Sequence, residues 1–163
     1  MNRFVFALVA LCLIQRPIPA SACSCAPGIR PFAAAAREAR YVVIARVIRH
    51  KRSWLLGGRK NLELAIEAVL VGPPDLHTLV VTGGKRNECR HTAAAFPVGT
   101  RWVLAVSSYG APTDLALSNC SESALALDDD MVTGIIRIDA SGGAVRESIP
   151  LEDLRTLLEP HLR

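Results

Sequence analysis

The sequence predicts a mainly β domain, an antiparallel barrel or sandwich with short helices beside it. Short runs rich in β-branched residues recur along the chain, as in Tyr41 to Ile48 and Arg101 to Val106. Glycine and proline turns such as Gly72-Pro73-Pro74 and Gly83-Gly84 separate these runs. Long helical patterns do not alternate with them, which argues against a doubly wound parallel sheet.

The first half of the chain is expected to form one short helix and two long strands. Phe32 to Ala39 is rich in alanine and predicts the helix. Tyr41 to Ile48 predicts a strand, and the basic stretch from His50 to Arg59 predicts a solvated tip after it. Leu62 to Val71 contains good helix formers, but the alternation of apolar and polar residues from Leu62 to Ile66 favours a strand that pairs with the first.

Three further strands, a hairpin and a terminal helix complete the prediction. The three strands are expected at Leu79 to Thr82, Arg101 to Val106 and Leu115 to Ser118. Ile135 to Ile138 and Ala144 to Ile149 flank a turn-rich segment and predict the hairpin. Pro150 then precedes leucines at helical spacing, which predicts a packed helix. These leucines are Leu151, Leu154, Leu157 and Leu158.

Residues 1–22 have the composition of a secretory signal peptide. Arg3 gives a positive start, Phe4 to Ile14 form an apolar run, and Ala20-Ser21-Ala22 offers a small-residue cleavage site. The apolar run is too short to span a bilayer. We therefore expect export to an extracellular or periplasmic space, with Cys23 as the first mature residue and no stable membrane insertion after cleavage. A short membrane anchor, a buried helix and a lipidated Cys23 are the alternatives.

What remains, Cys23 to Arg163, is long enough for a single domain and is expected to contain two disulfides. One of the five cysteines, Cys12, leaves with the signal peptide, and export favours oxidation of the others. The others are Cys23, Cys25, Cys89 and Cys120. Pairing Cys23 with Cys25 would close a strained small ring, so two long-range patterns remain. Either pattern fastens the N-terminal segment to the body of the domain.

The constellations of an enzyme are not visible in the sequence. His50, His77, His91 and His161 show no metal-ligand spacing and are expected to be surface or loop residues. Neither a nucleophile elbow nor a zinc-protease motif occurs. Asp128-Asp129-Asp130 lacks the alternating oxygen ligands of a calcium loop and predicts a solvated turn.

The charge of the chain does not indicate a nucleic-acid partner. The formal net charge is +4, and it falls to about +2 once the signal peptide is removed. Basic patches at His50-Lys51-Arg52 and Lys85-Arg86 suit a polyanion in principle, but the chain has too few aromatic residues for a platform that stacks single-stranded bases.

Several features between Cys23 and Cys120 occur together in one known family. They are Cys23-Ser24-Cys25-Ala26-Pro27, the predicted strand from Tyr41 to Val47, and the spacing of Cys89 and Cys120. This combination resembles the N-terminal, netrin-like domain of the tissue inhibitors of metalloproteinases. The resemblance implies a five-stranded OB-fold-like antiparallel barrel with flanking short helices. It also implies disulfides from Cys23 to Cys89 and from Cys25 to Cys120.

The same resemblance implies inhibition of a zinc metalloproteinase, with no cofactor of the chain's own. The α-amine and carbonyl oxygen of Cys23 would chelate the catalytic zinc of the target and displace its water, and Ser24 would point into the primary specificity pocket. A neutral α-amine is a suitable ligand for the open position of a catalytic zinc. The other expected contact residues are Cys25, Ala26, Pro27, Glu88, Cys89 and Arg90.

The sequence also departs from the family. The third disulfide of the inhibitory domain has no counterpart, since Phe32 is followed by Ala33, and the predicted hairpin and helix stand where the animal proteins have a six-cysteine domain. Lys85-Arg86-Asn87 is unusually basic for a contact loop. Two other hypotheses stay open: a disulfide-stapled binding module without inhibitory activity, and a thiolate and imidazole metal site at Cys89-Arg90-His91 with Cys23 and Cys25.

Overall fold

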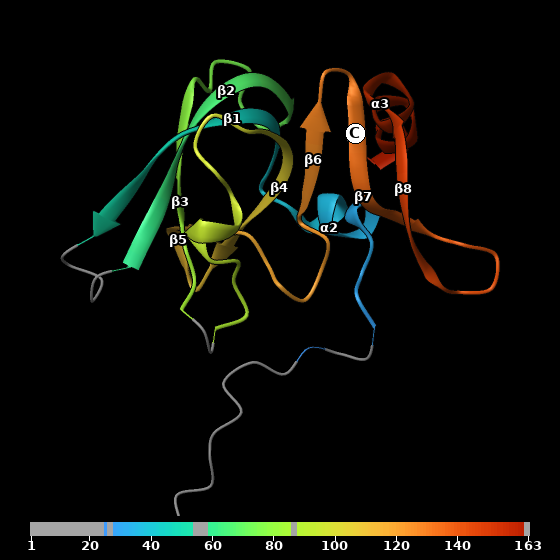
Figure 1. Cartoon of the computed structure of the whole chain (residues 1–163), viewed down its shortest axis with the longest axis horizontal. Coiled ribbons are helices and arrows are strands. Elements are labelled where there is room, and N and C mark those ends of the chain that lie inside the picture. Colours follow the sequence, from blue (N-terminus) through green and yellow to red (C-terminus); the bar gives the residue numbers. More distant parts are fainter. Residues whose placement is uncertain (1–24, 26–27, 54–58, 86–87, 162–163) are drawn as a thin grey trace, which may run out of the picture.

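The computed structural model describes Cys25 and residues 28–53, 59–85 and 88–161, which form one sheet flanked by α-helices (Figure 1). The helices are α2 (Phe32–Glu38) and α3 (Leu151–Leu158), and single 3-10 turns occur at η1 (Ala93–Ala95) and η2 (Glu159–His161). The strands are β1 (Tyr41–Ser53), β2 (Arg59–Val71), β3 (Thr78–Thr82), β4 (Arg101–Tyr109), β5 (Ala111–Ala116), β6 (Ala124–Asp128), β7 (Met131–Ile138) and β8 (Ala144–Pro150).

The sheet has eight strands, and every pair in it is antiparallel. The order is β3-β2-β1-β4-β6-β7-β8, with β5 paired to β4 beside this path. β3 also contacts β5, but no ladder joins the two within the described residues, and the sheet is open. The prediction of a mainly β antiparallel fold is therefore confirmed. A closed barrel with five strands is not, because the sheet has more strands and does not close.

The middle strands β1 and β4 are buried on both faces. Val42 and Ile44 of β1 point into one hydrophobic core, while Val43 and Ala45 point into a second core on the other face. Residues 103–106 of β4 alternate in the same way. A strand buried on both faces needs apolar residues at every position, and this explains the continuous apolar runs of the sequence.

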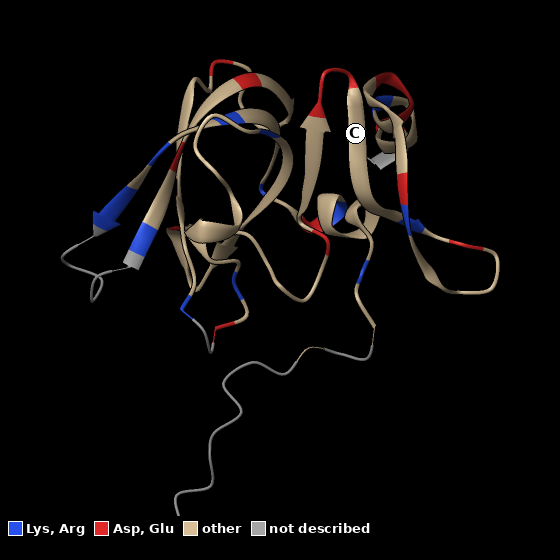
Figure 2. Cartoon of the chain, in the orientation of Figure 1, with Lys and Arg blue, Asp and Glu red and all other residues tan. Residues whose placement is uncertain are grey.

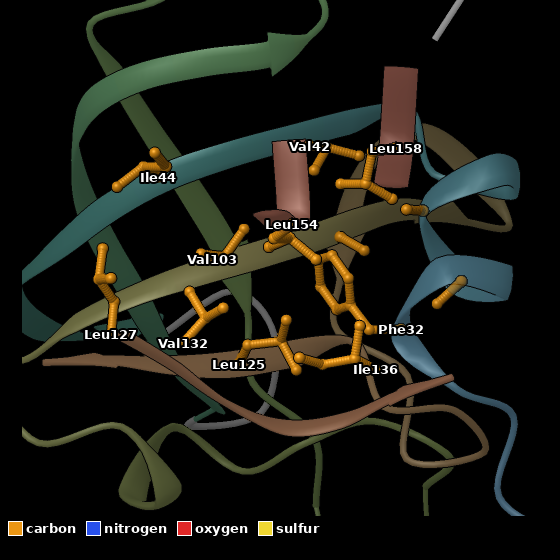
Figure 3. Close-up of a cluster of buried hydrophobic side chains, with 13 residues drawn as sticks. Phe32, Val42, Ile44, Val103, Leu125, Leu127, Val132, Ile136, Leu154 and Leu158 are labelled. Atoms are coloured by element: carbon orange, nitrogen blue, oxygen red, sulfur yellow. The ribbon is translucent and has the colours of Figure 1, made fainter. Parts of the chain in front are cut away.

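The first core lies between the sheet and the two helices (Figure 3). Phe32 of α2 is fully buried there, next to Ile136 of β7 in the close-up. Leu154 and Leu158 of α3 have no exposed surface and reach the same core. The leucine spacing that predicted this helix is thus the spacing of the residues that pack it.

The second core lies in the curved half of the sheet, where β1 to β5 gather on the left of Figure 1. Leu62 and Leu64 of β2 are buried in it opposite Leu104 and Val106 of β4. Phe96, which follows η1, closes one side. The alternation that favoured a strand at the start of β2 is therefore the alternation of buried and half-exposed positions.

Most predicted elements are present, with three corrections. β1 and β2 pair as far as Ser53 and Arg59, so part of the expected solvated tip is a two-stranded ribbon. The strand expected at 115–118 ends at Ala116, and Ser118 lies in an isolated bridge instead. β6 was not predicted, because its alternating alanine and leucine residues have low strand propensity and only the pairing with β4 and β7 makes them a strand.

Candidate functional site

The predicted disulfide between Cys25 and Cys120 is present. It joins residues 95 positions apart, and the two Cα atoms are 5.2 Å apart. Cys89 is disulfide-bonded as well, and the sulfurs of Cys25, Cys89 and Cys120 all lie within 4.8 Å of one another. We call this group of three cysteines the cysteine edge.

Four of the expected contact residues lie outside the described residues. They are Cys23, Ser24, Ala26 and Pro27. The disulfide from Cys23 to Cys89 therefore stays a prediction, as does the zinc-binding role of Cys23. The described contact residues Cys25, Glu88, Cys89 and Arg90 are brought together at the cysteine edge by the bonds described next.

Backbone hydrogen bonds fix the segment around Cys89 against the segment before Cys120. The amide of Asn119 donates to the carbonyl oxygen of Cys89 at 3.1 Å, and its side-chain amide donates to the carbonyl oxygen of Arg90 at 2.8 Å. The amide of His91 donates to the carbonyl oxygen of Leu117 at 2.9 Å. These bonds place both cysteines at the same edge of the fold.

A glycine makes this arrangement possible on the other side of the Cys89 segment. The amide of Gly84 donates to the carbonyl oxygen of His91 at 2.8 Å. A Cβ atom at Gly84 would lie 2.5 Å from the backbone oxygen of Arg90, closer than real Cβ contacts come. The close approach of the two backbones therefore requires glycine at this position.

The N-terminal segment runs along the chain that follows Cys120. Arg30 forms a parallel bridge with Ser121, and the amide of Glu122 donates to the carbonyl oxygen of Arg30 at 2.8 Å. The guanidinium of Arg30 also binds both carboxylate oxygens of Glu38 in α2, at 2.9 and 2.7 Å. The start of the described chain is thus attached by a disulfide and by backbone pairing.

The side chain of Arg90 has a structural role. Its guanidinium is only 7% exposed and donates to both carboxylate oxygens of Asp114 at 2.9 and 2.7 Å. It also lies over the ring of Tyr109, 4.2 Å from the centroid. A contact from position 90 to a partner would therefore involve the backbone, while the side chain holds the segment that carries Cys89.

Glu88 closes the turn before Cys89. Its amide donates to the carbonyl oxygen of Lys85 at 3.1 Å, and one carboxylate oxygen accepts from the amide of Lys85 at 3.4 Å. Lys85 is exposed beside it. Of the described residues here, Glu88 is acidic and Lys85 is basic.

The structure argues against a thiolate and imidazole metal site, because the described cysteines of that site are oxidised. Cys25 and Cys120 share a disulfide, and Cys89 is in a disulfide too. A disulfide sulfur is not the thiolate that binds zinc. The short distances among these sulfurs therefore reflect packed disulfides.

The other singled-out polar segments have structural positions. Asp128-Asp129-Asp130 forms the turn between β6 and β7, as expected, and Asp129 has a positive φ of 48°. The ribbon of β1 and β2 carries Lys51, Arg52 and Lys60, all exposed, near its far end, which is blue in Figure 2. His77 is exposed as expected, whereas His50 is half-buried and its Nε2 lies 2.8 Å from the carbonyl oxygen of Phe96.

One site was missed at the sequence level. His91 is half-buried rather than a surface residue, and it lines a hollow of about 230 Å³ together with Phe96, Trp102, Ala126, Glu122 and Arg146. We call it the His91 hollow. Burial lowers the pKa of the His91 imidazole, and the charge of Glu122 acts in the opposite direction. The available clue was that His91 and Glu122 each lie two residues after a cysteine of the cysteine edge, Cys89 and Cys120.

No protein-family model matches this chain, and a search of curated proteins finds no match either. In the described residues neither helix has the length and apolar character that a membrane span requires. The assignment of a function therefore depends on the chemistry of the cysteine edge and of the His91 hollow.

Proposed function

We propose that this chain is exported and inhibits zinc metalloproteinases. In this proposal cleavage after Ala22 makes Cys23 the N-terminal residue, and its α-amine and carbonyl oxygen chelate the catalytic zinc of the target. Ser24 enters the adjacent specificity pocket. Cys25, Ala26, Pro27 and the turn at Glu88 and Cys89 contact the enzyme around it.

The disulfide from Cys25 to Cys120 carries the proposal. It fastens the chain two residues after Cys23 to the body of the domain, within 4.8 Å of the sulfur of Cys89. A rigid N-terminal segment loses little conformational entropy on binding, and such preorganisation strengthens inhibitors. The pairing is also the one that the resemblance to the tissue inhibitors of metalloproteinases implies for these two cysteines.

The order of the strands adds support. Along the sheet β3, β2, β1, β4 and β5 are successive neighbours, and β3 contacts β5. An OB-fold barrel is a partly open five-stranded barrel, so an arrangement in which the first and last strands meet without a ladder is compatible with it. We propose that β1 to β5 are an OB-type barrel and that β6 to β8 with α3 extend it.

The chemistry of chelation is plausible for an N-terminal cysteine. A catalytic zinc keeps one position open for water, and an α-amine with an ordinary pKa of about 7.7 to 8.0 can lose its proton at modest cost. Once the amine and the carbonyl oxygen occupy the metal, the attacking water of the protease is displaced. The sulfur of Cys23 is not needed as a ligand and is free to form the predicted disulfide with Cys89.

The first experiment is an intact and peptide-mapped mass of the non-reduced exported protein. We expect a free amine at Cys23 and a disulfide from Cys23 to Cys89 beside the one from Cys25 to Cys120. An uncleaved or lipidated Cys23 would contradict the proposed mechanism.

The second experiment measures inhibition of a panel of zinc metalloproteinases by the mature protein and by a variant with one alanine added before Cys23. The extension moves the amine away from the zinc but leaves the fold unchanged, so we expect inhibition to weaken by at least about tenfold. Acetylation of the amine should have the same effect. Acetylation also modifies lysines, among them Lys85 beside the contact turn, so the alanine extension, which leaves every lysine unmodified, is the deciding variant. Lys51→Gln, in the ribbon of β1 and β2, is the matched control and should keep its potency.

Two results would contradict the proposal. Undiminished inhibition by the extended or acetylated protein would exclude chelation by the amine. No inhibition by a mature protein with a free Cys23 and both disulfides would exclude the activity, and it would favour the alternative of a binding module without inhibitory function.

A further inference from the structure

The His91 hollow is lined by none of the proposed inhibitory contact residues and results from the packing of the sheet. On β6, Leu125 and Leu127 point into the first core, so Ala124 and Ala126 face the other side. Across the sheet, Ala126 is paired with Trp102 of β4 on one side and with Thr133 of β7 on the other. Ala124 and Ala126 both line the hollow, and their small side chains leave the space of about 230 Å³.

Two aromatic rings form one wall of the hollow. Phe96 packs edge-on against Trp102, with 4.9 Å between the ring centroids, and His91 packs edge-on against Phe96 at 5.7 Å. The indole Nε1 of Trp102 donates to the hydroxyl of Thr100 at 2.7 Å, which fixes the ring. The wall is therefore apolar and rigid, as in sites for small ligands.

The polar residues Glu122, Arg146 and His91 also line the hollow, together with Thr133, whose hydroxyl donates to Ser148. The carboxylate of Glu122 is 16% exposed and accepts a hydrogen bond from the amide of Ile135 at 3.3 Å. A Cβ atom at Gly134 would lie 2.6 Å from this carboxylate, so the glycine provides its place. Arg146 of β8 approaches it to 3.8 Å and is 64% exposed. This loose ion pair leaves both charges able to bind a third group.

His91 completes the polar set as an acceptor. Its imidazole makes no hydrogen bond to any other described residue, and burial favours its neutral form. A neutral imidazole has one nitrogen that accepts a hydrogen bond. The hollow thus offers one anionic acceptor, one neutral acceptor and one forked cationic donor beside an aromatic wall.

We propose that the His91 hollow binds a small zwitterion of the α-amino-acid class with an apolar side chain. The ammonium group donates to Glu122 and His91, the carboxylate accepts from Arg146, and the side chain lies against Phe96 and Trp102. Neighbouring charges of opposite sign in the ligand match neighbouring charges of opposite sign in the protein. This proposal does not depend on the inhibitory function.

Other small ligands fit the same groups less well. A simple anion would meet the carboxylate of Glu122, and a simple cation would meet the guanidinium of Arg146, so each would place like charges together. A neutral sugar would leave the loose ion pair without a charged partner. Only a ligand with both charges uses all three polar groups.

The experiment titrates the intact protein with L-phenylalanine and L-leucine by calorimetry and by the NMR signal of the Trp102 indole. The same titrations are made with 3-phenylpropanoate, which lacks the ammonium, with phenethylamine, which lacks the carboxylate, and with D-glucose. We expect the amino acids to bind and the single-charge analogues to bind at least about tenfold more weakly. This comparison uses only the unmodified protein.

Variants localise the binding. Glu122→Gln and Arg146→Gln should each weaken it by about tenfold, and Ala126→Leu should fill the hollow and abolish it. The matched control is Arg137→Gln, an exposed arginine on β7 that pairs with Glu147 outside the hollow and should leave binding unchanged. No binding of either amino acid at millimolar concentrations would overturn the proposal. So would equal binding of the single-charge analogues, or binding of glucose alone.

Discussion

At the scale of single residues, burial acts on the imidazole of His91. It lowers the pKa of this group from its usual 6.5, and the charge of Glu122 opposes the shift only in part. Between the lowered pKa and pH 6.5 the folded protein binds fewer protons than the unfolded chain. The contribution of His91 to stability is therefore complete above about pH 6.5 and is lost as the pH falls below it.

Urea unfolding at a series of pH values measures this effect. We expect the free energy of unfolding of the wild type to fall as the pH decreases from about 6.5 to 5, and that of His91→Gln to fall less steeply. Glu122 and Arg146, the charged groups that line the hollow with His91, are present in both proteins. His77→Gln removes an exposed imidazole and is the matched control. Parallel curves for the wild type and His91→Gln would contradict the prediction.

The acidic groups act in a different pH range. A hydrogen bond from Arg30 lowers the pKa of Glu38, one from Arg49 lowers that of Glu63, and one from Ser141 lowers that of Asp139. A depressed carboxyl pKa adds stability above the unfolded value, and that stability is lost as the pH falls through the folded value. Their ordinary values are 4.5 for the glutamates and 3.8 for the aspartate, so these losses occur at lower pH than that of His91.

Cysteine pairing was predictable only in part from the residues themselves. They left two long-range patterns open, and the pairing of Cys25 with Cys120, which the family resemblance implied, is confirmed. Arg90 was expected to contact a partner because it neighbours Cys89, yet its side chain pairs with Asp114, 24 positions away. Residue type does not reveal such a partner, because the contact exists only after β4 and β5 have formed.

At the scale of elements, substitutions in α3 measure how much a short amphipathic helix contributes to the free energy of unfolding. Leu154 and Leu158 are fully buried in the first core, whereas Thr156 is exposed on the same helix. Leu154→Ala removes buried methyl groups and leaves a cavity under a helix of 8 residues. We expect it to lower the free energy of unfolding by about 3 kcal/mol, measured by urea denaturation.

Thr156→Ala is the control for this prediction, since it changes the same helix without touching the core. It should change stability much less than Leu154→Ala. A loss for Leu154→Ala no greater than that of the control would mean that α3 packs loosely and that the first core does not depend on it.

Helices and strands were predictable where a local sequence pattern decides the structure. The prediction failed where pairing with other strands decides it. The leucine spacing of α3 and the apolar run of β1 each have one interpretation, and both are confirmed. β6 reads Ala-Leu-Ala-Leu-Asp and becomes a strand only because β4 and β7 pair with it on either side. The ribbon beyond Ile48 reads as a basic loop, but it is paired because β1 and β2 stay in one register from Arg49 to Ser53, after the register shifts nearer the start of β1.

At the scale of the whole molecule, the sheet divides its two faces between two cores. Helices α2 and α3 cover the first, and the curvature of β1 to β5 encloses the second. The cysteine edge and the His91 hollow both lie where the segments 88–91 and 117–122 cross between these halves. The disulfide at the cysteine edge was expected from the family resemblance, but the hollow was not, because it requires segments that meet only in the folded sheet.

Removal of the disulfide from Cys25 to Cys120 tests whether the stability of the cysteine edge depends on a covalent link. Replacing both residues by serine removes the crosslink without creating a lone thiol, and it releases a closed loop spanning 95 positions. Loops of this length contribute about 4.7 kcal/mol in the chain-entropy model, so the melting temperature of the non-reduced protein should fall accordingly.

The same variant separates the two proposed sites. The backbone bonds that join His91 to Leu117 and Asn119 to Cys89 do not involve the disulfide, so amino-acid binding in the His91 hollow should persist at temperatures where the variant is folded. The segment carrying Cys23 loses its link to Cys120 and keeps the backbone pairing at Arg30 and the predicted disulfide to Cys89. Inhibition should weaken because more conformational entropy is lost on binding. Equal loss of both activities in a folded variant would contradict this division, since it would show that the disulfide, and not the strand pairing, positions the hollow.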